Sequence, residues 1–183
     1  MSFPPTHALV AVGLAEVVIA LKPAPRWRVW GVAALLGVMP DFDIILGLLL
    51  ALGGTLHGTM THSLSAVVIA ALVAYAFGGG RWALIAGTAY GSHLLVDMLD
   101  DRGPTNLMLG WPFTDAHPDA FGRFFPRVPM SGDGVIDTAL SLLRPEPLVK
   151  LVVQTLMGVM IFLVLAAIAR VIRRRREAAA PAC

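Results

Sequence analysis

The sequence predicts an all-α protein, a polytopic helical membrane bundle of about five transmembrane segments with a broken second helix. Hydrophobic residues make up 57% of the 183 residues and charged residues only 14%, whereas a soluble domain carries roughly 25% charged residues. The mean hydropathy is +0.75, and the apolar residues gather in segments divided by glycine, proline and charged residues. A soluble fold of this length has too little interior for so much apolar surface. We therefore expect one membrane domain over residues 1–183.

The apolar segments, in chain order, are residues 7–21, 30–52, 62–77, 82–98 and 148–172. Only the last is long enough to span a bilayer without interruption, because a span needs about 20 apolar residues. The second is interrupted by Pro40-Asp41-Phe42-Asp43, where the proline predicts a helix break. Three glycines at 78–80 separate the third from the fourth. No Lys or Arg precedes the first segment and we find no small-residue cleavage site, so we expect a retained helix rather than a signal peptide.

Basic residues give the predicted topology. They lie between segments one and two, between three and four, and after segment five, at Lys22, Arg26, Arg28, Arg81 and the arginine run 173–176. Five crossings put these sites on one side, which the positive-inside rule makes cytoplasmic. The sequence then divides into a metal-site core (6–99), an irregular outer connection (100–147), a final transmembrane helix (148–172) and a basic cytoplasmic tail (173–183). The arginine run at the end of an apolar segment predicts a membrane-edge anchor rather than a nucleic-acid site.

Ionisable residues inside membrane segments are costly, so each is a functional candidate. Asp41 and Asp43 would point to nearly opposite faces of a regular helix. In an irregular turn after Pro40 both carboxylates could converge on one ligand. The alternative is that one of them caps the half-helix that follows.

Histidines supply the other candidates. His57 and His62 flank a short loop, with Thr61 near the expected start of the third segment. His93 and Asp97 are four residues apart and share one helix face, as paired metal ligands in helical bundles do. Each histidine could instead be a hydrogen-bonded residue at the membrane edge or between helices.

The histidines and aspartates indicate a metal site more strongly together than any one motif does alone. His7, His57, His62, His93 and Asp97 all map to the outer side of the predicted topology. Converging imidazoles and carboxylates in a cleft of low dielectric need a cation to neutralise them. These ligands suit Zn, Mn or Fe, and the lone Cys183 excludes a multi-thiolate site. We expect one or two divalent ions, and two would suit hydrolysis of a phosphoester or an amide. Glu16 lies on the opposite face from His7 and is expected to serve helix packing or to face water.

The ordered motifs resemble those of the YdjM-type family, described as LexA-binding, inner-membrane-associated, metal-dependent hydrolases. The matching motifs are Thr6-His7-Ala8, Pro40-Asp41-Phe42-Asp43, the stretch 57–63, Ser92-His93-Leu94-Leu95-Val96-Asp97 and the stretches 103–107 and 111–113. The resemblance implies a helical bundle in a bacterial inner membrane with a metal-dependent hydrolase site. Two positions depart from the family pattern. Gly58-Thr59 follows His57 where Arg-Gly is common, and Asp100 stands where Thr or Asn is expected. We do not extend LexA binding to this chain.

Our leading hypothesis is a membrane-embedded metallohydrolase. Its predicted metal ligands are His7, Asp41, Asp43, His57, His62, His93 and Asp97. Asp100 is the candidate catalytic residue, as a general base or a further ligand, while Thr61 and Ser63 would orient ligands. The substrate would be amphipathic, a lipid-like phosphoester drawn from membrane lipid, with no nucleic-acid partner. The alternatives are a protein that binds or transports metal or protons, and a non-catalytic membrane scaffold. The oligomeric state is not set by the sequence.

Overall fold

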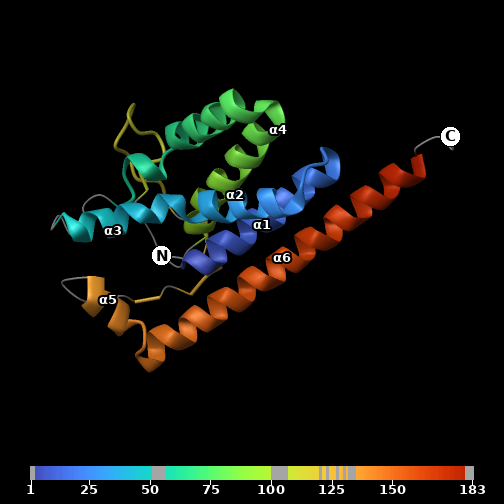
Figure 1. Cartoon of the computed structure of the whole chain (residues 1–183). Coiled ribbons are helices and arrows are strands. Elements are labelled where there is room, and N and C mark those ends of the chain that lie inside the picture. The colour runs from blue at the N-terminus through green and yellow to red at the C-terminus, as the bar shows by residue number, and fades with distance from the viewer. Residues whose placement is uncertain are drawn as a thin grey trace.

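The chain is represented by a computed structural model, which describes residues 3–50, 57–99, 107–119, 121–122, 124–126, 128–129, 131 and 135–179. These residues form the helices α1 (Pro4–Leu21), α2 (Arg26–Val38), η1 (Met39–Asp41), α3 (Phe42–Leu49), η3 (Met60–His62), α4 (Leu64–Met98), α5 (Val135–Ser141) and α6 (Pro145–Ala179). The predicted all-α helical bundle is confirmed. Figure 1 shows α1 beside α2 and α6, and α1 also contacts α4.

Among the described residues, four helical stretches are long and apolar enough to cross a membrane. They are Pro4–Leu21, Arg26–Gly47, Leu64–Met98 and Pro145–Ala179. The second is broken as predicted, because α2 ends at Val38 and a 3₁₀ turn containing Pro40 leads into α3. The last is longer than predicted, since α6 continues as a helix through the arginine run.

The predicted third and fourth segments are the two arms of α4. Gly79 has φ +74° and ψ −173°, a backbone conformation that glycine adopts without a steric penalty. The arms fold back on each other, because a Cβ on Gly87 would lie 3.5 Å from the Cβ of Ala71. One on Gly91 would lie 3.6 Å from Cγ1 of Val67. α4 is thus a helical hairpin, and the five apolar segments appear as four candidate spans because two of them are joined.

Small residues let α1 lie close to its neighbours. A Cβ on Gly37 of α2 would lie 2.6 Å from the Cβ of Ala11, and one on Gly13 would lie 2.8 Å from Cδ1 of Leu165 on α6. Close approach at small residues is typical of helix packing in membranes, where burial of apolar surface gives little driving force. The main buried cluster also joins α1 to α2 and α4, and consists of Ala11, Ala15, Val18, Ile19, Val29, Ala33, Ile85 and Ala89.

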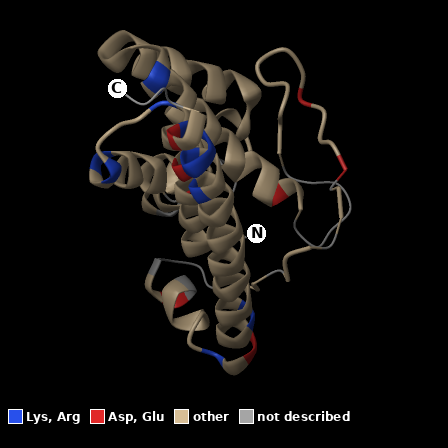
Figure 2. Cartoon of the chain, turned by 90° about the vertical axis from the view of Figure 1, so that its right-hand side faces the viewer, with Lys and Arg blue, Asp and Glu red and all other residues tan. Residues whose placement is uncertain are grey.

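The basic sites predicted to share one side of the membrane do lie together. Arg26 donates to Glu16 from Nε (3.0 Å) and Nη2 (2.7 Å), and Arg173 donates to it at 3.0 Å. Arg176 binds the last carbonyls of α1, and Arg81 donates to the carbonyl of Pro23 at 2.6 Å. Figure 2 shows blue positions gathered around red ones where α6 ends. That this end is cytoplasmic remains a prediction.

We expect Glu16→Ala to lower the free energy of unfolding by about 2 kcal/mol, because it removes a buried carboxylate that accepts charge-assisted hydrogen bonds from two partly exposed arginines. Glu16 is 1% exposed and also accepts a hydrogen bond from Nε1 of Trp30 at 2.7 Å. Thermal unfolding in detergent micelles measures the change. The control is Glu146→Ala, which breaks only an exposed pair with Lys150 and should cost less than about 0.5 kcal/mol. Equal losses in the two variants would show that the Glu16 cluster does not stabilise the fold.

Candidate metal centre

All seven residues predicted as metal ligands lie among the described residues, and the fold brings them together. They come from the start of α1 (His7), the break in the second span (Asp41 and Asp43), the turn before α4 (His57 and His62) and the last turns of α4 (His93 and Asp97). These places meet at one level of the bundle. α1 and the first arm of α4 begin there, the second arm of α4 ends there, and the span formed by α2 and α3 is broken there. Asp100 lies outside the described residues.

The break in the second span lets both aspartates approach one histidine. Asp41 Oδ1 lies 3.8 Å from Nε2 of His62, and Asp43 Oδ2 lies 3.2 Å from its Nδ1. A regular helix would have turned the two carboxylates apart. The two acids therefore contact opposite edges of a single imidazole ring.

His62 and His93 form the middle of the cluster. The carbonyl of Gly37 lies 2.8 Å from Nδ1 of His93, and because a carbonyl only accepts, that nitrogen carries the proton. Nδ1 of His62 faces the Asp43 carboxylate in the same way. Both rings consequently present their other nitrogen inward, and the two Nε2 atoms lie 3.1 Å apart. Two lone pairs at this distance repel each other unless a proton or a metal cation lies between them.

Two carboxylates flank the paired nitrogens. Asp97 Oδ2 lies 3.2 Å from Nε2 of His93 and 3.7 Å from that of His62, and Asp41 Oδ1 lies 3.5 Å from Nε2 of His93. All four carboxylate oxygens of these two acids are buried without a hydrogen-bond partner in the described part of the chain. Buried polar atoms rarely stay unsatisfied, so this environment favours a positively charged ligand.

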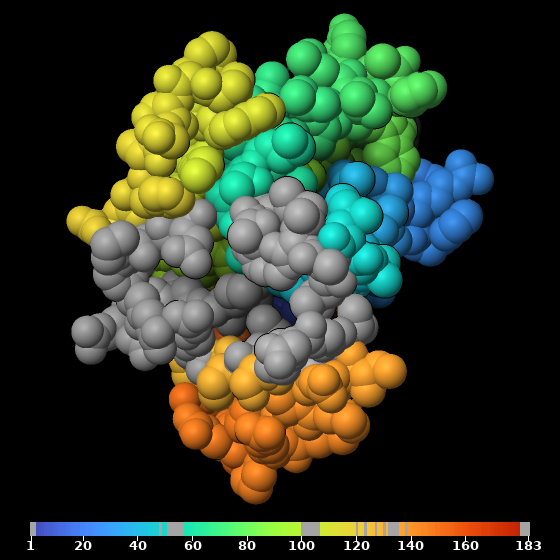
Figure 3. Space-filling model, turned by 90° about the vertical axis from the view of Figure 1, so that its left-hand side faces the viewer, coloured from blue at the N-terminus to red at the C-terminus, as the bar shows by residue number. Residues whose placement is uncertain are grey.

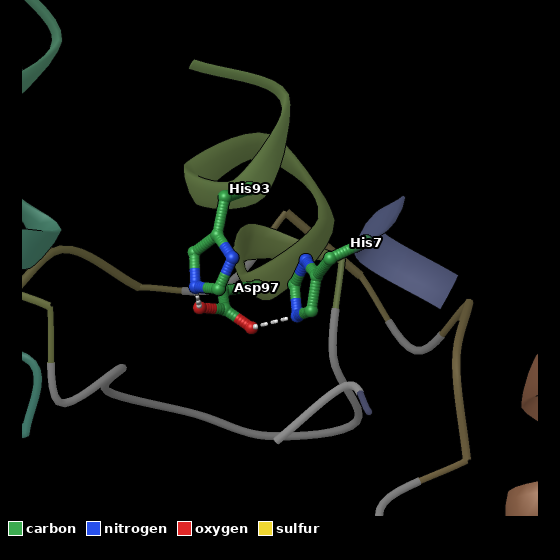
Figure 4. Close-up of side chains that lie close together, drawn as sticks. All are labelled: His7, His93 and Asp97. Atoms are coloured by element: carbon green, nitrogen blue, oxygen red, sulfur yellow. Dashed lines mark ion pairs between the residues drawn. The ribbon is translucent and has the colours of Figure 1, made fainter. Parts of the chain in front are cut away.

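His7 extends the cluster toward α1. Its ring stacks on that of His93 with centroids 3.8 Å apart, and its Nε2 lies 3.4 Å from Oδ1 of Asp97. In Figure 4 the Asp97 carboxylate lies between the two imidazoles, one of its oxygens toward each. Both nitrogens of His7 are buried and make no hydrogen bond among the described residues. His7 is therefore available as a ligand beside Asp97.

His57, Asp43 and Thr61 form a hydrogen-bonded group behind His62. Nδ1 of His57 lies 2.9 Å from Oδ1 of Asp43, and the Thr61 hydroxyl donates to Oδ2 at 2.5 Å. The same hydroxyl lies 3.0 Å from Nδ1 of His62. This group fixes the orientation of the His62 ring. Metal-binding histidines commonly have such a partner on the nitrogen that faces away from the metal.

Ser63 differs from the prediction that it orients ligands. It is the N-cap of α4, where its Oγ accepts from the backbone N–H of Ala66 at 3.2 Å. Its hydroxyl also donates to the carbonyl of Met60 at 2.7 Å. A serine at this position satisfies a free N–H of the first helical turn. Thr61, expected near the N-cap, lies two residues earlier and contacts the cluster instead.

The charges around His62 favour a bound cation or proton. Burial lowers the pKa of this imidazole, but the surrounding carboxylates of Asp41, Asp43 and Asp97 raise it by more, to about 9. Without a metal ion, His62 would then hold a proton at neutral pH. A divalent ion would replace that proton, since metal binding requires the deprotonated imidazole.

The side-chain spacing fits a metal ion. Ligand atoms bound 2.0–2.1 Å from a tetrahedral zinc ion lie about 3.3 Å from one another. The five distances among Nε2 of His62 and His93, Oδ1 of Asp41 and Oδ2 of Asp97 given above run from 3.1 to 3.8 Å. Three overlapping triads could each contribute to a site: His7, His93 and Asp97; Asp41, His62 and His93; Asp43, His57 and His62.

Two contributors to the cluster were not predicted from the sequence. The Gly37 carbonyl orients His93, but a backbone acceptor 56 residues away leaves no mark in the sequence. The Tyr90 hydroxyl donates to the carbonyl of Thr61 at 2.8 Å. Tyr90 precedes His93 by three residues and so shares its helix face, which is a signal that could have identified it.

The comparison with known protein families agrees with the motif resemblance. The model of the family described as YdjM inner membrane protein matches residues 1–177, so the chain belongs to that family. No curated protein and no solved structure matches the chain.

Proposed function

We propose that this member of the YdjM inner membrane protein family is a membrane-embedded, metal-dependent hydrolase that acts on a lipid-like phosphoester. The observation that carries the proposal is the pair of inward-facing Nε2 atoms of His62 and His93, 3.1 Å apart and flanked by unsatisfied carboxylates. Imidazole with carboxylate suits Zn, Mn or Fe. A bound ion of this kind lowers the pKa of water and polarises the substrate.

Each residue has a distinct part in this proposal. Asp41, His62, His93 and Asp97 would hold the ion, with His7 beside Asp97 as a further ligand. Asp43, His57 and Thr61 would hold the His62 ring in place through the contacts described above. Asp100 keeps its role as the candidate general base, which follows from the sequence alone.

The clustering of these side chains supports a reaction centre more than the alternatives. A transport path calls for ionisable groups spaced across the membrane, whereas these seven form overlapping triads at one level of the bundle. A scaffold would use its polar residues to pair helices, yet both carboxylates of Asp41 and Asp97 lack hydrogen bonds in the described residues.

The proposal is tested with metal-loaded protein in mixed micelles that contain a series of phospholipids, including phosphatidic acid. Phosphorus NMR detects release of phosphate or of a phosphorylated headgroup. We expect turnover by the wild type, its loss on chelation, and its recovery when Zn, Mn or Fe is restored. Asp97→Ala should be inactive, because it removes a carboxylate that faces both central histidines. Turnover that survives chelation, or no turnover of any phosphoester by metal-loaded wild type, would contradict the proposal.

A further inference from the structure

An apolar groove begins beside the His/Asp cluster and runs along the first arm of α4. Its walls come from the end of α2, from η3, from both arms of α4 and from Trp111, and its volume is about 520 Å³. Segment 107–119 closes one side, since the backbone N–H of Leu64 donates to the carbonyl of Leu109 and Ser65 donates to that of Trp111. Figure 3 shows this segment in yellow against the teal and green surface where α4 begins.

The groove extends along the first arm of α4. The first arm lines it from Ser65 to Ala74 with residues repeating every four positions, a distance of about 13 Å along a helix. The small side chains of Ala66, Ala70 and Ala86 form the bottom of the groove. Ile69 and Val73 also line it and are exposed. Most of the residues that line it are apolar, as a hydrocarbon chain requires.

One end of the groove meets the cluster. Thr61 lines the groove and also hydrogen-bonds Asp43 and lies against His62. Met39, another lining residue, is followed by Pro40 and Asp41. Tyr90 lines the groove and holds the Thr61 carbonyl through its hydroxyl. A molecule with an apolar tail in this groove would therefore carry its polar end toward the ligand atoms of the cluster.

We infer that the groove binds one acyl chain of a membrane lipid and presents the headgroup of that lipid to the metal centre. The inference deepens the proposed function and rests on it for the role of the headgroup. The groove lies on a helix apolar enough to span the membrane, so an acyl chain reaches it from the bilayer without passing through water. The groove then selects substrates by their hydrocarbon chain, and its length limits how much of the chain is held.

The test measures binding and needs no turnover. The protein in nanodiscs is exposed to phosphatidic acid that carries a photoreactive diazirine on one acyl chain, and the labelled residues are identified by mass spectrometry. We expect label on the first arm of α4 and near Trp111. Ala70→Trp fills the groove floor and should lower this labelling at least tenfold. Ala76→Trp is the control, because Ala76 is an exposed residue of the same arm outside the groove lining.

Two further measurements separate this inference from the proposed function. Labelling is repeated in the His93→Ala/Asp97→Ala variant, which should keep wild-type groove labelling because no groove residue is changed. Groove labelling of a metal-loaded wild type that hydrolyses no phosphoester would support the groove while the hydrolase proposal fails. Metal affinity of Ala70→Trp should equal that of the wild type, because no cluster residue is changed. Equal labelling of Ala70→Trp and Ala76→Trp would overturn the inference. It would also be overturned if the groove crosslinked to a protein partner in place of lipid, or if Ala70→Trp hydrolysed long-chain and short-chain lipids in the wild-type ratio.

Discussion

His93→Ala is expected to weaken divalent metal binding by more than about 100-fold, beyond the 10- to 100-fold loss typical of residues that only support a ligand. His93 is fully buried and its ring is in contact with His7, His62, Asp41 and Asp97. The Gly37 carbonyl fixes which of its nitrogens faces the cluster. Alanine removes that nitrogen, so the carboxylates of Asp41 and Asp97 lose one of the two central histidines that would bind the metal with them.

Isothermal titration calorimetry with Zn or Mn measures this loss on protein first stripped of metal. The matched control is His117→Ala, which changes an exposed histidine outside the three triads. We expect this control to bind metal as the wild type does. Thermal unfolding of both variants without metal checks that they are folded. If His93→Ala and His117→Ala bound metal equally well, the assignment of His93 as a ligand would be refuted.

Asp43→Asn is expected to weaken metal binding by about 10- to 100-fold without abolishing it. The carboxylate of Asp43 accepts from Thr61 and faces Nδ1 of His62, on the opposite edge of the ring from Asp41 and His93. An amide of the same shape removes the negative charge that keeps Nδ1 protonated and Nε2 free for the metal. The variant should therefore still bind metal at a high concentration of the ion.

The same titration tests this role, with Asp115→Asn as a control at an exposed aspartate. A complete loss of binding in Asp43→Asn, equal to that in His93→Ala, would make Asp43 a direct ligand, as the sequence alone predicted. Affinity equal to that of Asp115→Asn would remove it from the site. The intermediate result distinguishes a carboxylate that orients His62 from one that holds the metal.

Several features of the fold and the cluster could be predicted because they depend on local chemistry. Pro40 cannot continue a regular helix, so the break beside Asp41 follows from the sequence. The four-residue spacing of His93 and Asp97 places both on one face of α4. The glycines at 78–80 predict the reversal that Gly79 makes with its positive φ. Each of these signals lies within a few residues of the feature it predicts.

Other features depend on contacts between distant parts of the chain. Glu16 was expected only to pack or to face water, and its three partners include Arg173, which is 157 residues away. The arginine run was predicted as a membrane-edge anchor in a basic tail, but its helical conformation and the contacts of Arg173 and Arg176 with α1 were not predicted. The positions of Asp41 and Asp43 on opposite edges of the His62 ring were also not predictable. Both acids occur in one short motif, and the sequence does not show which of them faces which nitrogen. The groove is formed by residues of several elements and leaves no single pattern.

The central claim is that His62 and His93 hold a divalent cation, and elemental mass spectrometry of the detergent-purified wild type tests it most directly. Protein purified without chelators, and again after reconstitution, is analysed beside the His93→Ala/Asp97→Ala variant. The account predicts about one or two equivalents of Zn, Mn or Fe per chain in the wild type and loss of that metal in the variant. Wild-type protein without bound metal after reconstitution, or a variant with an undiminished metal content, would contradict it.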